Sequence, residues 1–144
     1  MTSVAEEARR WIGTPYVQGA SVRGGGTDCL GLLRGVWRAV VGAEPVAVPA
    51  YAPDWVDHGG AAALRDGLAQ ALRPVPLGRA WRPGEVVVFR LRPDGPAKHV
   101  GVVVETVPHV RFVHAYAGRG VVESSLSIPW ARRVAARYDF PLEG

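Results

Sequence analysis

Hydrophobic positions in the first half of the chain recur at the three-to-four-residue spacing of helices. A short helix is predicted between Ser3 and Gly13, because Ser3 and Glu6 have the spacing of a capping box. Another helix is predicted over residues 61–72, where leucines recur at every fourth position. Both helices would bury one apolar face.

The longest predicted helix follows a glycine-rich segment directly. Residues 19–27 contain four glycines and are predicted to form a loop. The helix is predicted to begin with Thr27 or Asp28 as its cap and to run to Gly42. The next segment, 44–53, has three prolines and is predicted to be a surface loop.

After residue 76 the pattern changes to β-branched residues punctuated by turn residues. In one predicted strand, Val100, Val102 and Val104 alternate with His99, so the histidine should face away from these valines. Helices followed by strands predict an α+β fold, with N-terminal helices packed on a C-terminal antiparallel sheet. The predicted strands are 85–91, 99–106, 111–116, 121–124 and 134–140.

Length and composition favour one domain over residues 1–144, because the chain has 144 residues and 48% of them are hydrophobic. A lone cysteine excludes an internal disulfide. No secretory signal and no membrane-spanning stretch are recognisable. We therefore expect a chain made in the cytoplasm without a signal peptide and without direct membrane insertion.

The net charge of +4 is compatible with anionic partners, including nucleic acid and carboxylate-rich wall polymer. The densest basic points are Arg9-Arg10 and Arg132-Arg133, and neither is interleaved with aromatic residues. A platform for nucleic acid needs such aromatics. A solvated basic surface is therefore favoured, and no nucleic acid partner is expected.

Cys29 stands where the glycine-rich loop turns into the helix, and it is the candidate nucleophile. A helix N-terminus presents free N–H groups and a positive dipole end, which favour a thiolate and predict alkylation below the pH expected for an ordinary thiol. Its own backbone N–H could stabilise an oxyanion. His99 is the candidate base, and His114 could accept the ring N–H of His99 and fix its tautomer.

Plainer interpretations exist for each of these residues. Cys29 could be a small buried hydrophobic residue, and His99 or His114 could be structural histidines. His58 and His109 are predicted to lie in loops without a role. Zinc is disfavoured because no close Cys or His pair occurs, and phosphate binding is disfavoured because no Gly-Lys-Ser/Thr follows the glycines. We expect no metal and no cofactor.

Taken together, five segments resemble the NlpC/P60 family of papain-like cysteine peptidases, which cleave the peptide stems of bacterial cell wall. They occur in the family's order over residues 9 to 116, which is most of the chain. The matching segments are Gly13-Thr14-Pro15-Tyr16 leading to Gly19, Asp28-Cys29-Leu30-Gly31-Leu32, Arg82 to Phe89, His99-Val100-Gly101-Val102-Val103, and Val113-His114-Ala115.

The resemblance implies a papain-like fold with Cys29 as nucleophile, His99 as base and His114 as the orienting third residue. Tyr16 matches a tyrosine whose hydroxyl reaches the nucleophile. Asp28 matches an acidic residue that in many members holds the free amine of the stem peptide. The implied reaction is hydrolysis of a stem-peptide amide bond, between D-glutamate and the diamino acid.

Leu30 departs from the serine that most cell-wall members have after the cysteine. A bulky apolar residue there is similar to a branch found in phage tails and gene transfer particles. The arginine-containing helix after it and the segment Val48-Pro49-Ala50-Tyr51 resemble the same branch. This resemblance implies a tail-associated peptidase that contacts tail hub or tip proteins and acts in the periplasm or wall of a target cell. The alternatives are a structural tail component, or an amidase or acyltransferase on the same scaffold.

Overall fold

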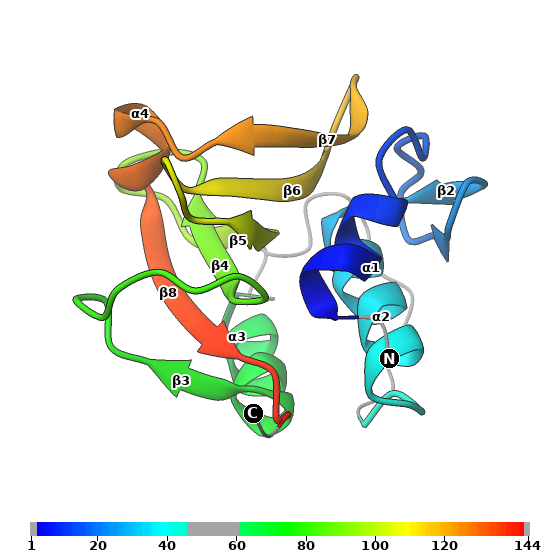
Figure 1. Ribbon diagram of the computed structural model, residues 1–144, viewed down its shortest axis with the longest axis horizontal. Helices are drawn as coiled ribbons and strands as arrows, with labels where there is room; N and C mark the ends of the chain where they lie inside the picture. Colours follow the sequence, from blue (N-terminus) through cyan, green and yellow to red (C-terminus); the bar gives the residue numbers. More distant parts are fainter. Residues whose placement is uncertain (1–2, 46–60, 143–144) are drawn as a thin grey trace.

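The computed structural model describes residues 3–45 and 61–142 and combines four helices with two sheets (Figure 1). The helices are α1 (Val4–Arg10), α2 (Cys29–Val40), α3 (Ala61–Ala71) and α4 (Ile128–Ala131). The strands are β1 (Ser21–Val22), β2 (Gly26–Thr27), β3 (Arg73–Val75), β4 (Val86–Arg90), β5 (Ala97–Glu105), β6 (Arg111–Tyr116), β7 (Gly120–Ser125) and β8 (Val134–Asp139).

The larger sheet has the strand order β3-β8-β4-β5-β6-β7, and every neighbouring pair is antiparallel. Helices α1 and α2 lie side by side and pack on β5, while α2 also reaches β6 (Figure 1). The predicted α+β arrangement of helices on an antiparallel sheet is therefore confirmed. Its physical basis is the strict alternation in β5, where Val100, Val102 and Val104 face the helices and Val103 faces the other side.

Helix α1 begins as its sequence predicts. The Ser3 hydroxyl accepts the backbone N–H of Glu6, and the Glu6 carboxylate accepts the backbone N–H of Ser3, which completes the capping box. Trp11 at the end of α1 is buried against Gly35 of α2, where an added Cβ would lie 2.0 Å from the indole ring. Glycine at this position allows the two helices to approach closely.

The second face of the sheet carries its own apolar cluster, made of Val87, Phe89, Val103 and Phe112. Trp130 of α4 packs against this cluster, with its ring centroid 4.9 Å from that of Phe89. Helix α4 was not predicted from the sequence; it is only four residues long and exposes most of its residues. Short helices of this kind have too few residues to show a period.

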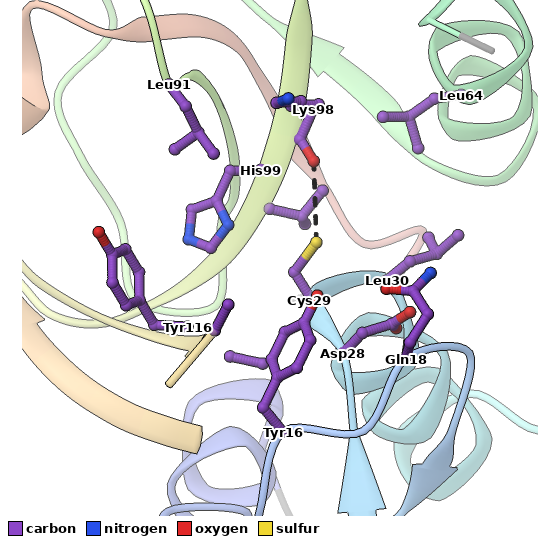
Figure 2. Close-up of a pocket in the computed structure, with 13 residues that line it drawn as sticks. Tyr16, Gln18, Asp28, Cys29, Leu30, Leu64, Leu91, Lys98, His99 and Tyr116 are labelled. Carbon is purple, nitrogen blue, oxygen red and sulfur yellow. Dashed lines mark hydrogen bonds between the residues drawn. The ribbon is translucent and has the colours of Figure 1, made fainter. Parts of the chain in front are cut away.

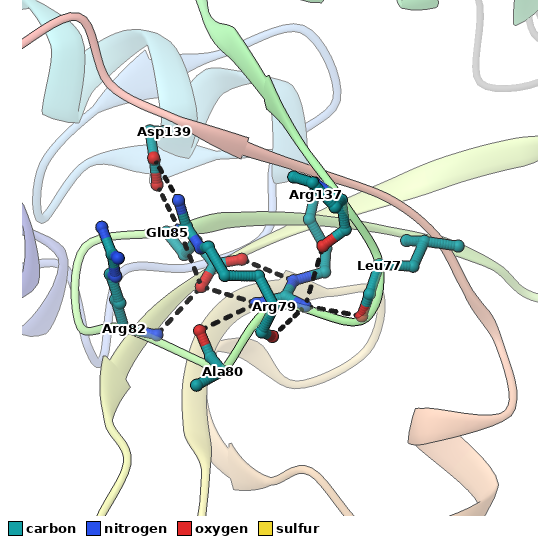
Figure 3. Close-up of polar contacts among 8 residues, drawn as sticks. Leu77, Arg79, Ala80, Arg82, Glu85, Arg137 and Asp139 are labelled. Carbon is teal, nitrogen blue, oxygen red and sulfur yellow. Dashed lines mark hydrogen bonds and ion pairs between the residues drawn. The ribbon is translucent and has the colours of Figure 1, made fainter.

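A buried ion-pair network anchors the segment that leads into β4 (Figure 3). The Arg137 guanidinium donates to both carboxylate oxygens of Glu85, at 2.6 and 3.0 Å, and to the carbonyl oxygens of Leu77 and Arg79. It also stacks on Trp81, 3.8 Å from the ring centroid. Both charged side chains are buried, so their mutual pairing is what makes burial tolerable.

One local prediction differs from the structure, and one further strand was not predicted. Residues 19–27, predicted to form a loop, contain the short hairpin of β1 and β2, and Arg73–Val75 form the edge strand β3. Strands of two or three residues are fixed by pairing rather than by their own pattern. Residues 46–53 of the predicted proline loop lie outside the described residues.

Candidate active site

A pocket of about 540 Å³ lies where the N-terminus of α2 meets the start of β5 and the end of β6 (Figure 2). It brings together residues that are far apart in sequence, because α2 packs on β5 and β6. Its lining residues are Tyr16, Gln18, Asp28, Cys29, Leu30, Leu64, Leu91, Lys98, His99, Val100, Ala115, Tyr116 and Ala117.

Cys29 is the first residue of α2 and is partly exposed in this pocket. Asp28, one of the two caps predicted, is the N-cap, and its carboxylate accepts the backbone N–H of Gly31 at 2.7 Å. The backbone N–H groups of Cys29, Leu30 and Val100 face the sulfur and lower the pKa of the thiol. They are donors of the kind that a developing oxyanion requires.

The protonation state that burial favours for the candidate nucleophile differs from the one expected. Burial raises the pKa of the Cys29 thiol to about 11, and together with a smaller raising effect from the Asp28 charge it outweighs the backbone donors. The thiol donates to the carbonyl oxygen of Lys98 at 3.8 Å. Burial therefore favours the neutral thiol over the expected thiolate in the free protein, because desolvation opposes the effect of the helix N-terminus.

The imidazole rings of His99 and His114 are hydrogen-bonded to each other. Nε2 of His99 lies 2.7 Å from Nδ1 of His114, and the two rings are nearly perpendicular, with an interplanar angle of 79°. In Figure 2 the imidazole of His99 and the sulfur of Cys29 face the same space. Since Nε2 of His99 is hydrogen-bonded to His114, Nδ1 is the ring nitrogen available to a group in the pocket.

Aromatic side chains enclose this histidine pair. Trp130 stacks on His99 with ring centroids 5.7 Å apart, and Tyr116 approaches His99 edge-on at 6.1 Å. Burial lowers the pKa of His99 to about 3, with a further contribution from His114. It also lowers the pKa of His114 to about 4. Both imidazoles are therefore neutral near pH 7, as a general base must be.

The three remaining candidates from the sequence also lie in the pocket. Tyr16 is half-buried, and the pKa of its hydroxyl is raised to about 12 by burial and then by the nearby Cys29 and Asp28 charges. Asp28 is 2% exposed and accepts the backbone N–H of Gly19 at 2.8 Å in addition to its cap bond. Leu30 contributes an apolar wall.

The other two histidines lie elsewhere or outside the described residues. His109 is exposed in the bend between β5 and β6, and His58 lies outside the described residues.

Within residues 3–45 and 61–142, no group of three or more His, Cys, Asp or Glu side chains is placed to hold a metal ion. In the same part of the chain, no helix has the length and apolarity to cross a bilayer.

Neither a protein-family model nor a curated protein matches this sequence. Solved structures do match over nearly its full length. The NlpC/P60 domain of the peptidoglycan hydrolase SagA matches with a TM-score of 0.63 and 22% identity, covering 96% of this chain and 97% of that one. The chain has the NlpC/P60 fold.

Two longer NlpC/P60 proteins match to a similar degree. A lipoprotein-like protein of the family from Staphylococcus aureus subsp. aureus Mu50 has a TM-score of 0.62 and 20% identity. A family protein from Bacillus cereus ATCC 10987 has a TM-score of 0.66 and 16% identity. Each match covers 97% of this chain but only 41% of the longer protein.

Within this NlpC/P60 fold, three site features were not predicted from the sequence. They are the backbone N–H of Val100, the Trp130 ring over His99, and Ser124, whose hydroxyl oxygen lies 2.8 Å from Nε2 of His114. Strand alternation in β7 places Ser124 on one face, but only the pairing of β6 with β7 puts that face beside His114.

Proposed function

We propose that this chain is a cysteine peptidase that cleaves peptide stems of bacterial cell wall, with Cys29 as nucleophile and His99 as base. The observation that carries the proposal is the pocket in which a helix-start thiol meets a directly bonded histidine pair. The NlpC/P60 fold supports it, since SagA, a structural neighbour, is described as a peptidoglycan hydrolase.

In the first step the Cys29 sulfur attacks the amide carbonyl carbon, and its proton passes to Nδ1 of His99. Burial favours the neutral forms of both the thiol and the imidazole, so proton transfer ahead of attack is uphill. We therefore expect the proton to move as the carbon–sulfur bond forms. The electron pair of the carbonyl π bond moves to oxygen, and the backbone N–H of Cys29 can donate a hydrogen bond to the oxyanion that forms.

Collapse of the tetrahedral intermediate breaks the carbon–nitrogen bond and leaves a thioester on Cys29. His99 returns its proton to the departing amine, which leaves as a neutral amine. Water then attacks the thioester, giving a proton to His99 and restoring the thiol when the carbon–sulfur bond breaks. His114 keeps the His99 ring in place through both steps by accepting from Nε2.

The substrate is proposed to be the bond between D-glutamate and the diamino acid of the stem peptide. Tyr16 and Asp28 are proposed to border the acyl-side subsite, because both line the pocket beside the sulfur. Asp28 also holds two backbone N–H groups, so its first role is to fix the start of α2. Leu30 in place of serine gives that subsite an apolar wall.

The biological setting is proposed from the resemblance of residues 28–37 to tail-associated members. In that setting the protein joins a phage-like tail through hub or tip proteins and opens the wall of the target cell during DNA delivery. Activity would then be needed at one point of the wall and only when the particle docks. The periplasm or cell wall of the target is the proposed place of action.

The direct test is digestion of purified wall fragments, with mass analysis of the products. Wild type should release fragments with a new D-glutamate carboxyl end, whereas Cys29→Ala and His99→Ala should release none. His109→Ala is the matched control, because this histidine is exposed in a bend away from the pocket. Equal product from wild type and Cys29→Ala would refute the thiol mechanism, and no product from either would favour a structural tail component. Transfer of the acyl group to an added amine would indicate an acyltransferase instead.

A further inference from the structure

We propose that Ser124 is a positioning residue that sets the tautomers of His114 and His99 by accepting a hydrogen bond from His114. This inference rests on the proposed function, because it concerns the base of that reaction. Nε2 of His114 lies 2.8 Å from Oγ of Ser124, and Nδ1 of His114 lies 2.7 Å from Nε2 of His99. Both ring nitrogens of His114 are thus engaged, one on each side.

The positions of the ring protons on His114 and His99 decide whether His99 can act as a base. Each neutral imidazole carries a single ring proton. If His99 is to accept a proton from Cys29 at Nδ1, its own proton must be on Nε2. Nδ1 of His114 must then be the acceptor, which places the proton of His114 on Nε2. Only the Ser124 oxygen lies within hydrogen-bond distance of that proton among the described residues.

The reversed order would disable the base. If the Ser124 hydroxyl donated to Nε2 of His114, the proton of His114 would lie on Nδ1 and would be donated to His99. His99 would then carry its proton on Nδ1, facing the pocket, and could not take another from Cys29. The same three side chains therefore have a working order and a non-working order, which differ only in proton placement.

Ser124 is well placed to act as the acceptor. It lies on β7, where Phe112 pairs with Ser124 and His114 pairs with Val122, so the register holds its side chain beside the imidazole. The Ser124 side chain is half-buried, whereas His114 is 1% exposed. The hydroxyl proton of Ser124 can turn toward solvent, and this leaves an oxygen lone pair for the buried ring.

Three variants separate this role from a packing role. Ser124→Ala removes the acceptor, Ser124→Thr keeps a hydroxyl and suits a strand, and Ser125→Ala is the matched control. Ser125 is the next residue of β7, is exposed and accepts from Arg111, with no bond to either histidine. Nitrogen-15 NMR of the ring nitrogens at pH 7 reports the tautomers directly, without any substrate. Digestion of wall fragments reports kcat/KM.

In the wild type, Nδ1 of both His99 and His114 should be the unprotonated nitrogen. In Ser124→Ala the protons should shift toward the reversed order, because a buried N–H without an acceptor is less tolerated than an unpaired acceptor. We expect at least about a tenfold loss of kcat/KM, since a wrong histidine tautomer costs about 10⁴ in a serine triad. Ser124→Thr should restore the wild-type tautomers and most of the activity, and Ser125→Ala should change neither.

Wild-type tautomers in Ser124→Ala would overturn the inference, even if activity fell, because the loss would then be structural. If the histidine tautomers in Ser124→Thr matched those in Ser124→Ala, that result would also overturn the inference. Should Cys29→Ala digest wall fragments as well as wild type, the proposed function would fail by itself. The NMR result would still decide whether Ser124 orders the histidine protons.

Discussion

The sulfur of Cys29 lies 3.8 Å from the carbonyl oxygen of Lys98, the residue immediately before the proposed base. In the free protein the thiol proton is therefore directed to the backbone of β5. Burial favours a neutral thiol at Cys29 and a neutral imidazole at His99, and under the proposed mechanism a bound peptide brings the thiol proton to His99. Catalytic hydrogen bonds of this kind often tighten only when substrate binds.

Alkylation of Cys29 should show this neutral resting state. With a thiol pKa of about 11, the rate of reaction with iodoacetamide should rise about tenfold per pH unit from pH 7 to pH 9, without levelling off. Mass spectrometry of the intact chain measures it cleanly, because Cys29 is the only cysteine. The urea-unfolded chain is the control and should level off near an ordinary thiol pKa of about 8.5. A plateau below pH 8 in the folded protein would mean that a thiolate–imidazolium pair already exists.

Mild acid should destabilise the fold through the histidine pair. The pKa of His99 is lowered to about 3 and that of His114 to about 4, so below pH 6.5 the unfolded chain binds protons that the folded chain does not. Stability is thus complete above pH 6.5 and falls with pH, by up to about 1.4 kcal/mol per pH unit for each ring.

Urea unfolding between pH 7 and pH 5 measures this slope, in a range where most carboxyl groups are still ionised. His114→Asn removes one titrating ring and should make the slope shallower. An unchanged slope in this variant would show that His114 is protonated equally in the folded and unfolded chains.

Two glycine-to-alanine substitutions should change the free energy of unfolding in opposite directions. Gly35→Ala places a methyl group 2.0 Å from the Trp11 ring and should destabilise the protein by about 1–3 kcal/mol. Gly67→Ala in α3 meets no atom within 4 Å and should stabilise it by up to about 1 kcal/mol, because alanine is the better helix former. Denaturant midpoints of the two variants test this contrast. A neutral Gly35→Ala would imply that α1 and α2 can separate at no cost.

Loss of the buried Glu85 charge should be far more damaging than loss of a surface charge. Glu85→Gln leaves the Arg137 guanidinium buried without its counter-ion and should cost about 3–5 kcal/mol. Arg9→Gln, at a pair whose arginine is 41% exposed, should cost at most about 1 kcal/mol. Equal losses of unfolding free energy in the two variants would contradict the assignment of Glu85 and Arg137 as a buried pair.

Local sequence patterns predicted the elements that depend on near neighbours. The capping box of α1, a cap of α2 at Thr27 or Asp28 and the alternation in β5 all involve residues within a few positions of each other. The capping box and the alternation are found as expected, and the structure selects Asp28 as the cap. The short strands β1, β2 and β3 were missed, because strands of that length take their definition from a partner elsewhere in the chain.

The sequence by itself determined which residues could carry chemistry, since a cysteine at a helix start and histidines on strands are properties of short segments. Only the tertiary structure decided how those groups behave. The raised pKa of the Cys29 thiol, the lowered pKa values of both histidines and the hydrogen bond between His114 and Ser124 all arise from burial and from strand register. Desolvation and register depend on contacts between residues far apart in the chain, and no local pattern contains them.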